Sequence, residues 1–151
     1  MALSDDMELL SAVPLFQDLD KDQLRLIAFG AEHRPISAGQ ALFREKSPAE
    51  CAYVIARGRF ELSTLGRGGK PKVEAIAEPG TMLSELALAT MVERKYTAIA
   101  LEDSNVIRIT RALFHRLLEE YPEMAEILQN RIRQNIAALA TQAASLGYRF
   151  T

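Results

Sequence analysis

The feature that most constrains the fold is a regular succession of short apolar segments between residues 33 and 110. Gly39, Gly58, the run "GRGGKP" at 66–71 and the pair Pro79-Gly80 punctuate these segments with turn-forming residues. Such punctuated short segments are typical of the strands of a β-sandwich or barrel. We therefore expect strands at 33–36, 41–45, 51–56, 59–65, 72–77, 95–101 and 104–109.

The run "GRGGKP" is glycine-rich, but it is not expected to bind phosphate. It lacks the strand-to-helix setting and the Lys-Ser/Thr ending of a phosphate loop. The sequence predicts a flexible hairpin here.

Helical patterns precede the strand region. Asp20 followed by Gln23 is a helix-start pattern, and the helix is expected to end near Gly30. Its apolar face consists of Leu24, Ile27 and Ala28. A shorter helix is expected at 6–12, ended by Pro14. The sequence thus predicts helices at the entry to the strand region.

Helical patterns also follow the strands. Thr110 is a capping residue for a helix whose apolar face consists of Phe114, Leu117 and Leu118. Tyr121-Pro122 marks a break, because proline favours a first helical position. A long helix is then expected from Pro122 to Leu146.

One face of this long helix carries a repeating seam. Its members alternate by four and three residues: Ala125, Gln129, Ile132, Ile136, Leu139, Ala143 and Leu146. Either the helix lies on its own barrel, or it pairs with its twin in a homodimer through residues 125–146. We favour the dimer.

Composition narrows the class of protein. A chain of 151 residues is expected to form one domain, 1–151, with helices at 5–30, strands at 32–110 and helices at 111–146. The formal net charge of −2 gives no electrostatic footprint for nucleic acid. The longest apolar stretch, "CAYVIA", is too short to span a membrane, and the acidic N-terminus is unlike a signal peptide. We therefore expect a cytoplasmic protein.

Reactive residues are few. A single cysteine, Cys51, forms no internal disulfide and is expected to be a buried small hydrophobe in a strand. His33 and His115 have no neighbours at metal-ligand spacing, so no metal site is expected. The sequence shows no nucleophile paired with a base, so no catalytic residue is assigned and an enzyme is not expected.

Glu85 and Arg94 lie nine positions apart in a stretch that begins at a Pro-Gly turn. A short helix starting near Ser84 would offer backbone N–H groups to a phosphate, and arginine offers a planar fork of donors to two phosphate oxygens. Glutamate suits a sugar hydroxyl. These three features describe a sugar-phosphate site, although the spacing alone also fits a glutamate–arginine ion pair or two surface charges.

Two blocks of the sequence resemble the cyclic-nucleotide-binding domains of protein kinase A regulatory subunits, gated ion channels and catabolite-activator-type regulators. "PGTMLSELALATMVERKYTAIALED" is similar to their phosphate-binding cassette, which reads Gly-Glu-Leu-Ala-Leu, a short loop, Arg, two small residues and Thr. The matching residues are Glu85, Leu86, Ala87, Leu88, Arg94, Thr97 and Ala100. "ISAGQALFREKSPAECAYVIARGRFELS" agrees through Gly39, Phe43, Tyr53, Ile55 and Gly58, and "LLSAVPLFQDLDKDQLRLIA" resembles the helical entry to such domains.

The resemblance implies an α+β fold, an antiparallel β-roll of the double-stranded β-helix or jelly-roll type with N-terminal helices and a long C-terminal helix. It implies a regulatory module whose ligand is cAMP or cGMP, with no other cofactor. Arg94 and the helix start at Ser84–Leu86 would hold the phosphate, and Glu85 the ribose. The implied site consists of Leu83, Ser84, Glu85, Leu86, Ala87, Arg94, Lys95 and Tyr96.

The chain departs from the family pattern at four positions. Ser84 and Lys46 stand where the family has glycine, and Lys95 and Tyr96 stand where it has small residues. Lys95 either adds a phosphate contact or occupies the pocket, and Tyr96 either stacks on a purine or fills the base cavity. If either side chain fills the pocket, the alternative is a degenerate domain that binds no nucleotide and acts in protein interaction or dimerisation.

Catabolite-type regulators continue into a DNA-reading helix-turn-helix. Only "GYRFT" follows Leu146 here, so no nucleic-acid partner is expected from this chain. Met1 favours a natural N-terminus. The chain is expected either to act through a protein partner or to be the sensor part of something longer.

Overall fold

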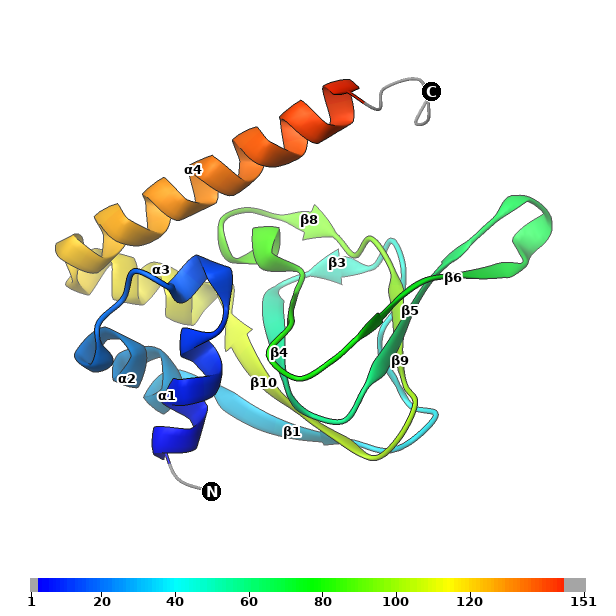
Figure 1. The fold of residues 1–151 in the computed structure, drawn as a ribbon, viewed down its shortest axis with the longest axis horizontal. Coiled ribbons are helices and arrows are strands. Elements are labelled where there is room, and N and C mark those ends of the chain that lie inside the picture. Colours follow the sequence, from blue (N-terminus) through cyan, green and yellow to red (C-terminus); the bar gives the residue numbers. More distant parts are fainter. Residues whose placement is uncertain (1–2, 146–151) are drawn as a thin grey trace.

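The structure, a computed structural model, describes the backbone of residues 3–145 and the side chains of residues 5–66 and 68–134. Helices gather at one end and a roll of β-strands forms the other, with the long helix α4 (Pro122–Ser145) leading away from the helical end (Figure 1). The hairpin of β5 and β6 projects from the far side of the roll (Figure 1).

The N-terminal helices are α1 (Leu3–Ser11), the 3-10 helix η1 (Pro14–Phe16) and α2 (Lys21–Gly30). The predicted start of α2 is confirmed. The Asp20 carboxylate accepts a hydrogen bond from the Gln23 backbone N–H at 2.8 Å, and the Gln23 side chain accepts one from the Asp20 N–H at 2.9 Å. This reciprocal capping box satisfies two backbone donors that have no acceptor within the helix.

All strands pair antiparallel, in three groups. The first sheet has the order β1 (Glu32–Ile36), β10 (Ser104–Thr110), β4 (Cys51–Arg57) and β7 (Met82–Leu83). The second has the order β2 (Ala41–Phe43), β9 (Thr97–Ala100), β5 (Phe60–Leu65) and β6 (Pro71–Ala77). A short pair joins β3 (Pro48–Ala49) to β8 (Val92–Glu93). The predicted antiparallel roll, with helices before and after it in the chain, is confirmed.

Two strand predictions need correction. The strand expected at 95–101 is wrong at its start, because β9 begins at Thr97 and leaves Lys95 and Tyr96 in the preceding turn. The two-residue strands β3, β7 and β8 were not expected. Each exists only through its partner strand, and two residues are too few to show an alternating pattern.

The segment between β5 and β6 forms the predicted hairpin, with the 3-10 turn η2 (Arg67–Gly69) at its tip. A further 3-10 helix, η3 (Glu85–Leu88), begins directly after Ser84, where a short helix is expected. The chain therefore changes from strand to helix at the residues expected to bind phosphate.

The C-terminal helices are α3 (Arg111–Glu120) and α4. The Thr110 hydroxyl accepts a hydrogen bond from the Leu113 N–H at 3.0 Å, which confirms the predicted cap, and the break falls at Tyr121. Within the seam, Ala125 and Ile132 are half-buried and Gln129 is exposed. The side chains of Ile136, Leu139 and Ala143, and Leu146 as a whole, lie outside the described residues. The dimer remains a prediction.

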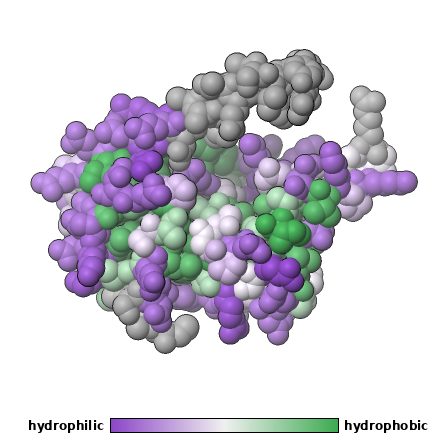
Figure 2. Space-filling view, viewed as in Figure 1, coloured by the Kyte–Doolittle hydropathy of each residue, from purple (hydrophilic) through white to green (hydrophobic). Residues whose placement is uncertain are grey.

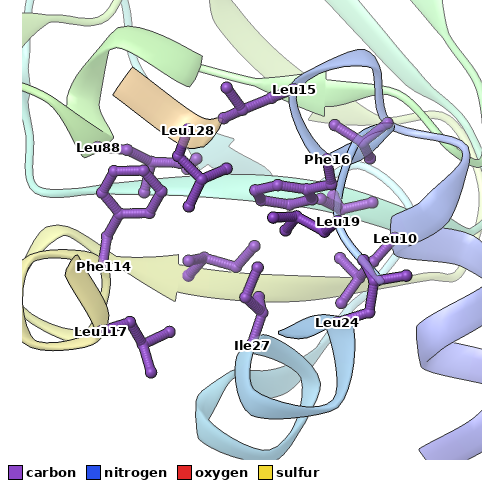
Figure 3. Packing of buried hydrophobic residues seen from close by; sticks show 14 of the residues in the cluster. Leu10, Leu15, Phe16, Leu19, Leu24, Ile27, Leu88, Phe114, Leu117 and Leu128 are labelled. Atoms are coloured by element: carbon purple, nitrogen blue, oxygen red, sulfur yellow. The ribbon is translucent and has the colours of Figure 1, made fainter. Parts of the chain in front are cut away.

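Two groups of buried side chains fill the interior. The helical-end cluster joins α1, η1, α2, α3 and α4 to one face of β4 and β10, and Figure 3 shows Phe16, Ile27, Phe114 and Leu128 converging within it. The roll cluster lies inside the strands and consists of Ile36, Ile55, Phe60, Leu62, Ala77, Leu83, Ala98, Ala100 and Val106. Leu88 of η3 belongs to the helical-end cluster, so η3 packs against the helical end of the interior.

The face of the molecule in Figure 2 is mainly hydrophilic, with a hydrophobic patch over the strands beside the projecting hairpin. Exposed apolar residues in those strands are Leu65, Val73 and Ile76. Within the described part of the chain, no helix combines the length and the apolar character needed to cross a membrane. Among the same residues, no group of His, Cys, Asp and Glu side chains is arranged to hold a metal ion.

Candidate functional site

A pocket of about 470 Å³ opens where η3, β7 and β8 meet the roll. Its wall is mainly apolar and carries a few polar groups, as small-molecule sites usually do, and its volume falls within their usual range. The lining residues are Phe43, Leu62, Thr81, Met82, Leu83, Ser84, Glu85, Leu86, Val92, Glu93, Lys95 and Tyr96. The pocket thus lies on the stretch that the sequence singles out.

Ser84 turns the chain from β7 into η3. Its backbone adopts the left-handed conformation, with φ 64° and ψ 44°, which costs a residue with a side chain roughly 1–2 kcal/mol. Lys46 also has a positive φ, 68°. Both are positions where the family pattern has glycine. The backbone therefore keeps the shape that glycine favours although both side chains differ, and the loops store conformational strain.

Arg94 is buried, with 6% of its surface exposed, and does not line the pocket. Its Nη1 donates to the Cys51 carbonyl oxygen at 2.8 Å, and its Nη2 contacts Cys51 Sγ at 3.4 Å. The guanidinium carbon lies 4.6 Å from the centre of the Phe43 ring and 5.3 Å from that of Tyr53. Phe43 lines the pocket, so its ring is shared between the pocket and the arginine.

The buried guanidinium of Arg94 lacks part of its hydrogen-bonding and charge partners. Nε is buried without a hydrogen-bond partner, and no ion pair joins Arg94 to a carboxylate of the described residues. Cation–π contacts and one carbonyl offset part of the cost of burying the charge. An anion beside Nε would complete its partners.

Tyr53 and Cys51 flank the arginine. The Tyr53 ring stacks on Phe43 at 6.0 Å between ring centres. Burial, followed by contact with the Cys51 thiol, raises the pKa of the Tyr53 hydroxyl, so this side chain is neutral at physiological pH. Cys51 lies buried in β4, as the sequence predicts. The Arg94 guanidinium thus contacts two aromatic rings and the carbonyl and sulfur of Cys51.

The structure brings most of the predicted site residues around one pocket: Leu83, Ser84, Glu85, Leu86, Lys95 and Tyr96. Glu85 is half-buried at the start of η3, Lys95 is exposed, and Tyr96 is half-buried against the roll cluster. Lys95 and Tyr96 both line the pocket, and its volume of about 470 Å³ is the space left beside their side chains. Ala87 is fully buried and, like Arg94, does not line the pocket.

Several lining residues were missed by reasoning from the sequence: Leu62, Thr81, Met82, Val92 and Glu93. Their strands meet only through pairing between distant segments, which no local pattern reveals. The sequence did point to Phe43 and Tyr53, because both belong to the second block that resembles the family.

Comparison with known proteins identifies the family. Residues 33–121 match the family profile described as "Cyclic nucleotide-binding domain". This range contains the roll, the pocket and α3. The chain therefore belongs to the cyclic nucleotide-binding domain family.

Two curated relatives illustrate the range of the family. A lysophospholipase of Chaetomium globosum is 30% identical over 111 residues, which cover 71% of this chain and 7% of the relative. The cyclic AMP receptor protein of Thermus thermophilus is 26% identical over 125 residues, which cover 80% of this chain and 58% of the relative. The chain thus spans only part of either relative's length.

Solved structures are similar as well. A cyclic nucleotide-binding-like protein from Brucella abortus is 42% identical with a TM-score of 0.70, and the match covers 76% of this chain and 98% of that one. The regulatory domain of Toxoplasma gondii PKA, solved with cAMP, is 25% identical with a TM-score of 0.71, covering 76% of this chain and 43% of that one.

Proposed function

We propose that the chain is a regulatory module that senses a cyclic nucleotide, cAMP or cGMP. Arg94 and the helix start at Ser84–Leu86 would hold the phosphate, and Glu85 the ribose. The observation that carries the proposal is the buried Arg94 guanidinium, whose Nε has no partner and which no described carboxylate neutralises. A cyclic phosphate carries the negative charge and the acceptor oxygens that this group needs.

The pocket beside Arg94 supports the rest of the ligand. Its apolar wall, including Leu62, Met82 and Leu83, suits a purine base, and Glu85 supplies an acceptor for a ribose hydroxyl. Tyr96 has a half-buried ring on which a purine can stack. Lys95 is exposed and lines the pocket, where its ammonium group can meet a phosphate oxygen.

Binding would act as a switch. The phosphate neutralises Arg94, which tightens the loop after Glu85, and α4 then moves to cover the base. Such a switch requires only that the ligand bind one helix position better than the other. The output would pass to a protein partner or to a second copy through residues 125–146.

A second candidate is a degenerate domain that no longer binds nucleotide and serves protein interaction or dimerisation. Two observations favour it. The Phe43 ring lies against the guanidinium of Arg94 and also lines the pocket, and Ser84 and Lys46 replace glycines of the family pattern. The two candidates differ in whether Arg94 ever meets a ligand.

Calorimetric titration with cAMP and with cGMP separates them. Arg94→Ala is expected to cost about 2–5 kcal/mol of binding free energy, because the anion is left with too few donors. Glu85→Ala is expected to cost about 1–3 kcal/mol for a lost acceptor. Arg116→Ala, which removes an exposed arginine of α3, is the matched control and leaves binding unchanged.

Lys95 and Tyr96 decide the remaining question. If they obstruct the pocket, Lys95→Ala improves affinity and the double variant with Tyr96→Ala improves it further. If Lys95 contacts phosphate, the same change weakens binding and flattens its salt dependence. Absence of binding at millimolar nucleotide, in the natural chain and in the double variant alike, refutes the sensor and leaves the interaction module.

A further inference from the structure

Arg111, the first residue of α3, joins three parts of the fold. Its Nε donates to the Ala87 carbonyl oxygen at 2.7 Å, and its Nη2 donates to the Ala49 carbonyl oxygen. Its backbone N–H donates to the Glu50 carbonyl oxygen at 2.9 Å. A single side chain therefore connects the start of α3 to η3 and to β3.

The two side-chain acceptors lie next to the proposed binding residues. Ala87 belongs to η3, which Glu85 begins. Ala49 belongs to β3, and its partner across the strand pair is Val92 of β8. The same pairing continues to Arg94, whose N–H donates to the Ser47 carbonyl at 2.8 Å and whose carbonyl accepts from the Lys46 N–H at 2.8 Å. Arg111 thus bonds directly to η3 at one end of the loop between Glu85 and Arg94, and it is linked to β8 at the other end through β3.

The chemistry of this contact requires arginine. Ala87 and Ala49 are buried, so their carbonyl oxygens depend on protein donors. A guanidinium presents two parallel N–H groups in a rigid plane and reaches both acceptors at once. A lysine ammonium is a point donor on a flexible stem and replaces only one of the two bonds with comparable geometry.

Apolar packing also holds η3 in place, but it does not extend to β3 or β8. Leu88 is fully buried in the helical-end cluster, beside Phe114 and Leu128 in Figure 3. These contacts fix η3 to α3 and α4, whereas β3 and β8 lie outside that cluster. Among the described residues, the Arg111 side chain is the one that hydrogen-bonds to both η3 and β3.

We infer that Arg111 is a positioning residue for the pocket: it sets the separation between the segments that carry Glu85 and Arg94. For the ligand, the inference rests on the proposed function, since these residues are the proposed ribose and phosphate contacts. The positioning itself is a property of the ligand-free protein. It can therefore be measured without nucleotide.

The test is amide hydrogen exchange, followed by NMR, in the ligand-free chain carrying Arg111→Gln. The amides of Ala87, Ala89 and Arg94 report on the loop, since each makes a backbone hydrogen bond there. They are expected to exchange at least about tenfold faster than in the natural chain, from the strength of charge-assisted hydrogen bonds. Amides of the β5–β9 pair serve as the internal reference and stay unchanged.

Two further variants separate positioning from general destabilisation. Arg111→Lys keeps the charge and one bond, so it is expected to give an intermediate acceleration and to fold if the glutamine variant does not. Arg116→Gln changes an exposed arginine of the same helix and leaves all the named amides unchanged. In parallel titrations, nucleotide affinity falls about tenfold in Arg111→Gln and less in Arg111→Lys.

The outcomes are distinct. Acceleration of the reference amides by the same factor, or none at the loop amides, overturns the positioning role. Unchanged nucleotide affinity in Arg111→Gln overturns its importance for binding. If the natural chain binds neither cAMP nor cGMP while the loop amides accelerate as expected, the proposed function fails and the positioning of the loop by Arg111 stands.

Discussion

The helical-end cluster and the roll cluster are both interiors of one small domain, but they are filled differently. The helical-end cluster is packed by its own side chains, with Phe16, Phe114 and Leu128 almost fully buried. The roll cluster borders a pocket of about 470 Å³ and is flanked by half-buried Tyr53 and Tyr96 and by the buried charge of Arg94. The helical-end cluster is centred on closely packed side chains, whereas the roll cluster borders open space.

The largest expected effect tests the helical-end cluster. Phe16→Ala should lower the free energy of unfolding by about 3–5 kcal/mol, since Phe16 is fully buried and a large cavity opens among residues that cannot close around it. Leu62→Ala, in the roll cluster at the pocket wall, should cost about half as much, because the space it leaves joins an existing pocket. Urea denaturation measures both. Equal losses would contradict the division between the two clusters.

A change of the opposite sign is expected at Arg94. Arg94→Met replaces a buried, incompletely bonded guanidinium by an apolar side chain of similar length. The ligand-free protein should gain about 1–2 kcal/mol in free energy of unfolding and lose nucleotide binding. Arg116→Met, at an exposed position, should change neither quantity by more than about 0.5 kcal/mol. A destabilised Arg94→Met variant would mean that the arginine serves the fold rather than a ligand.

The third prediction concerns the backbone strain at Ser84, which lines the pocket beside the roll cluster. Its left-handed conformation carries strain, and its side chain makes no capping hydrogen bond. Ser84→Gly should therefore raise the free energy of unfolding by about 0.5–1 kcal/mol, after the entropy cost of glycine is subtracted. Ser84→Ala keeps the strain and should give no gain. Thermal denaturation of the two variants side by side distinguishes strain from side-chain effects.

The smallest effect is electrostatic and lies at the helical end. His33 faces Asn105 Oδ1 at 2.7 Å and Asp6 Oδ2 at 2.8 Å. The hydrogen bond to Asn105, then that to Asp6, raises the pKa of His33 above 6.5. The protonated ring thus stabilises the fold at pH below 6.5, and this contribution is lost as the pH rises through the folded-state pKa.

Because His33 is partly exposed, the contribution should not exceed about 1 kcal/mol. Denaturation midpoints measured between pH 5 and pH 8 should fall with rising pH in the natural chain, by about that amount at most. The His33→Gln variant should lack this component. A profile that is the same in both chains would remove His33 as its source.

Local signals predicted the starts of α2 and α3 well. The Asp20–Gln23 box and the Thr110 cap each depend on residues three positions apart, so the sequence contains all that is needed. The short strands β3, β7 and β8 could not be predicted, since their existence depends on partners far along the chain. The same limit applies to the pocket: its cassette residues follow from the resemblance, whereas Leu62 and Val92 reach it only through the folded sheets.

The position of Arg94 is the most informative departure. The sequence indicates an arginine that faces a phosphate, whereas the structure buries its guanidinium against Phe43, Tyr53 and Cys51. Local sequence spacing could not predict these contacts, because the two rings and the carbonyl come from strands that precede Arg94 by some forty to fifty residues. The family resemblance identifies Arg94 as a site residue. Only the folded structure shows that its guanidinium is buried and that its Nε has no hydrogen-bond partner.

The central claim, that Arg94 awaits an anionic ligand, can be tested at the atom that lacks a partner. In a ¹H–¹⁵N spectrum of arginine Nε groups, the signal lost in Arg94→Lys identifies Arg94. On addition of cAMP or cGMP, that signal is predicted to shift downfield and to exchange more slowly with water, because Nε–H gains a phosphate acceptor. An Arg94 Nε signal that stays unchanged at saturating nucleotide, or at millimolar nucleotide without binding, would contradict the account.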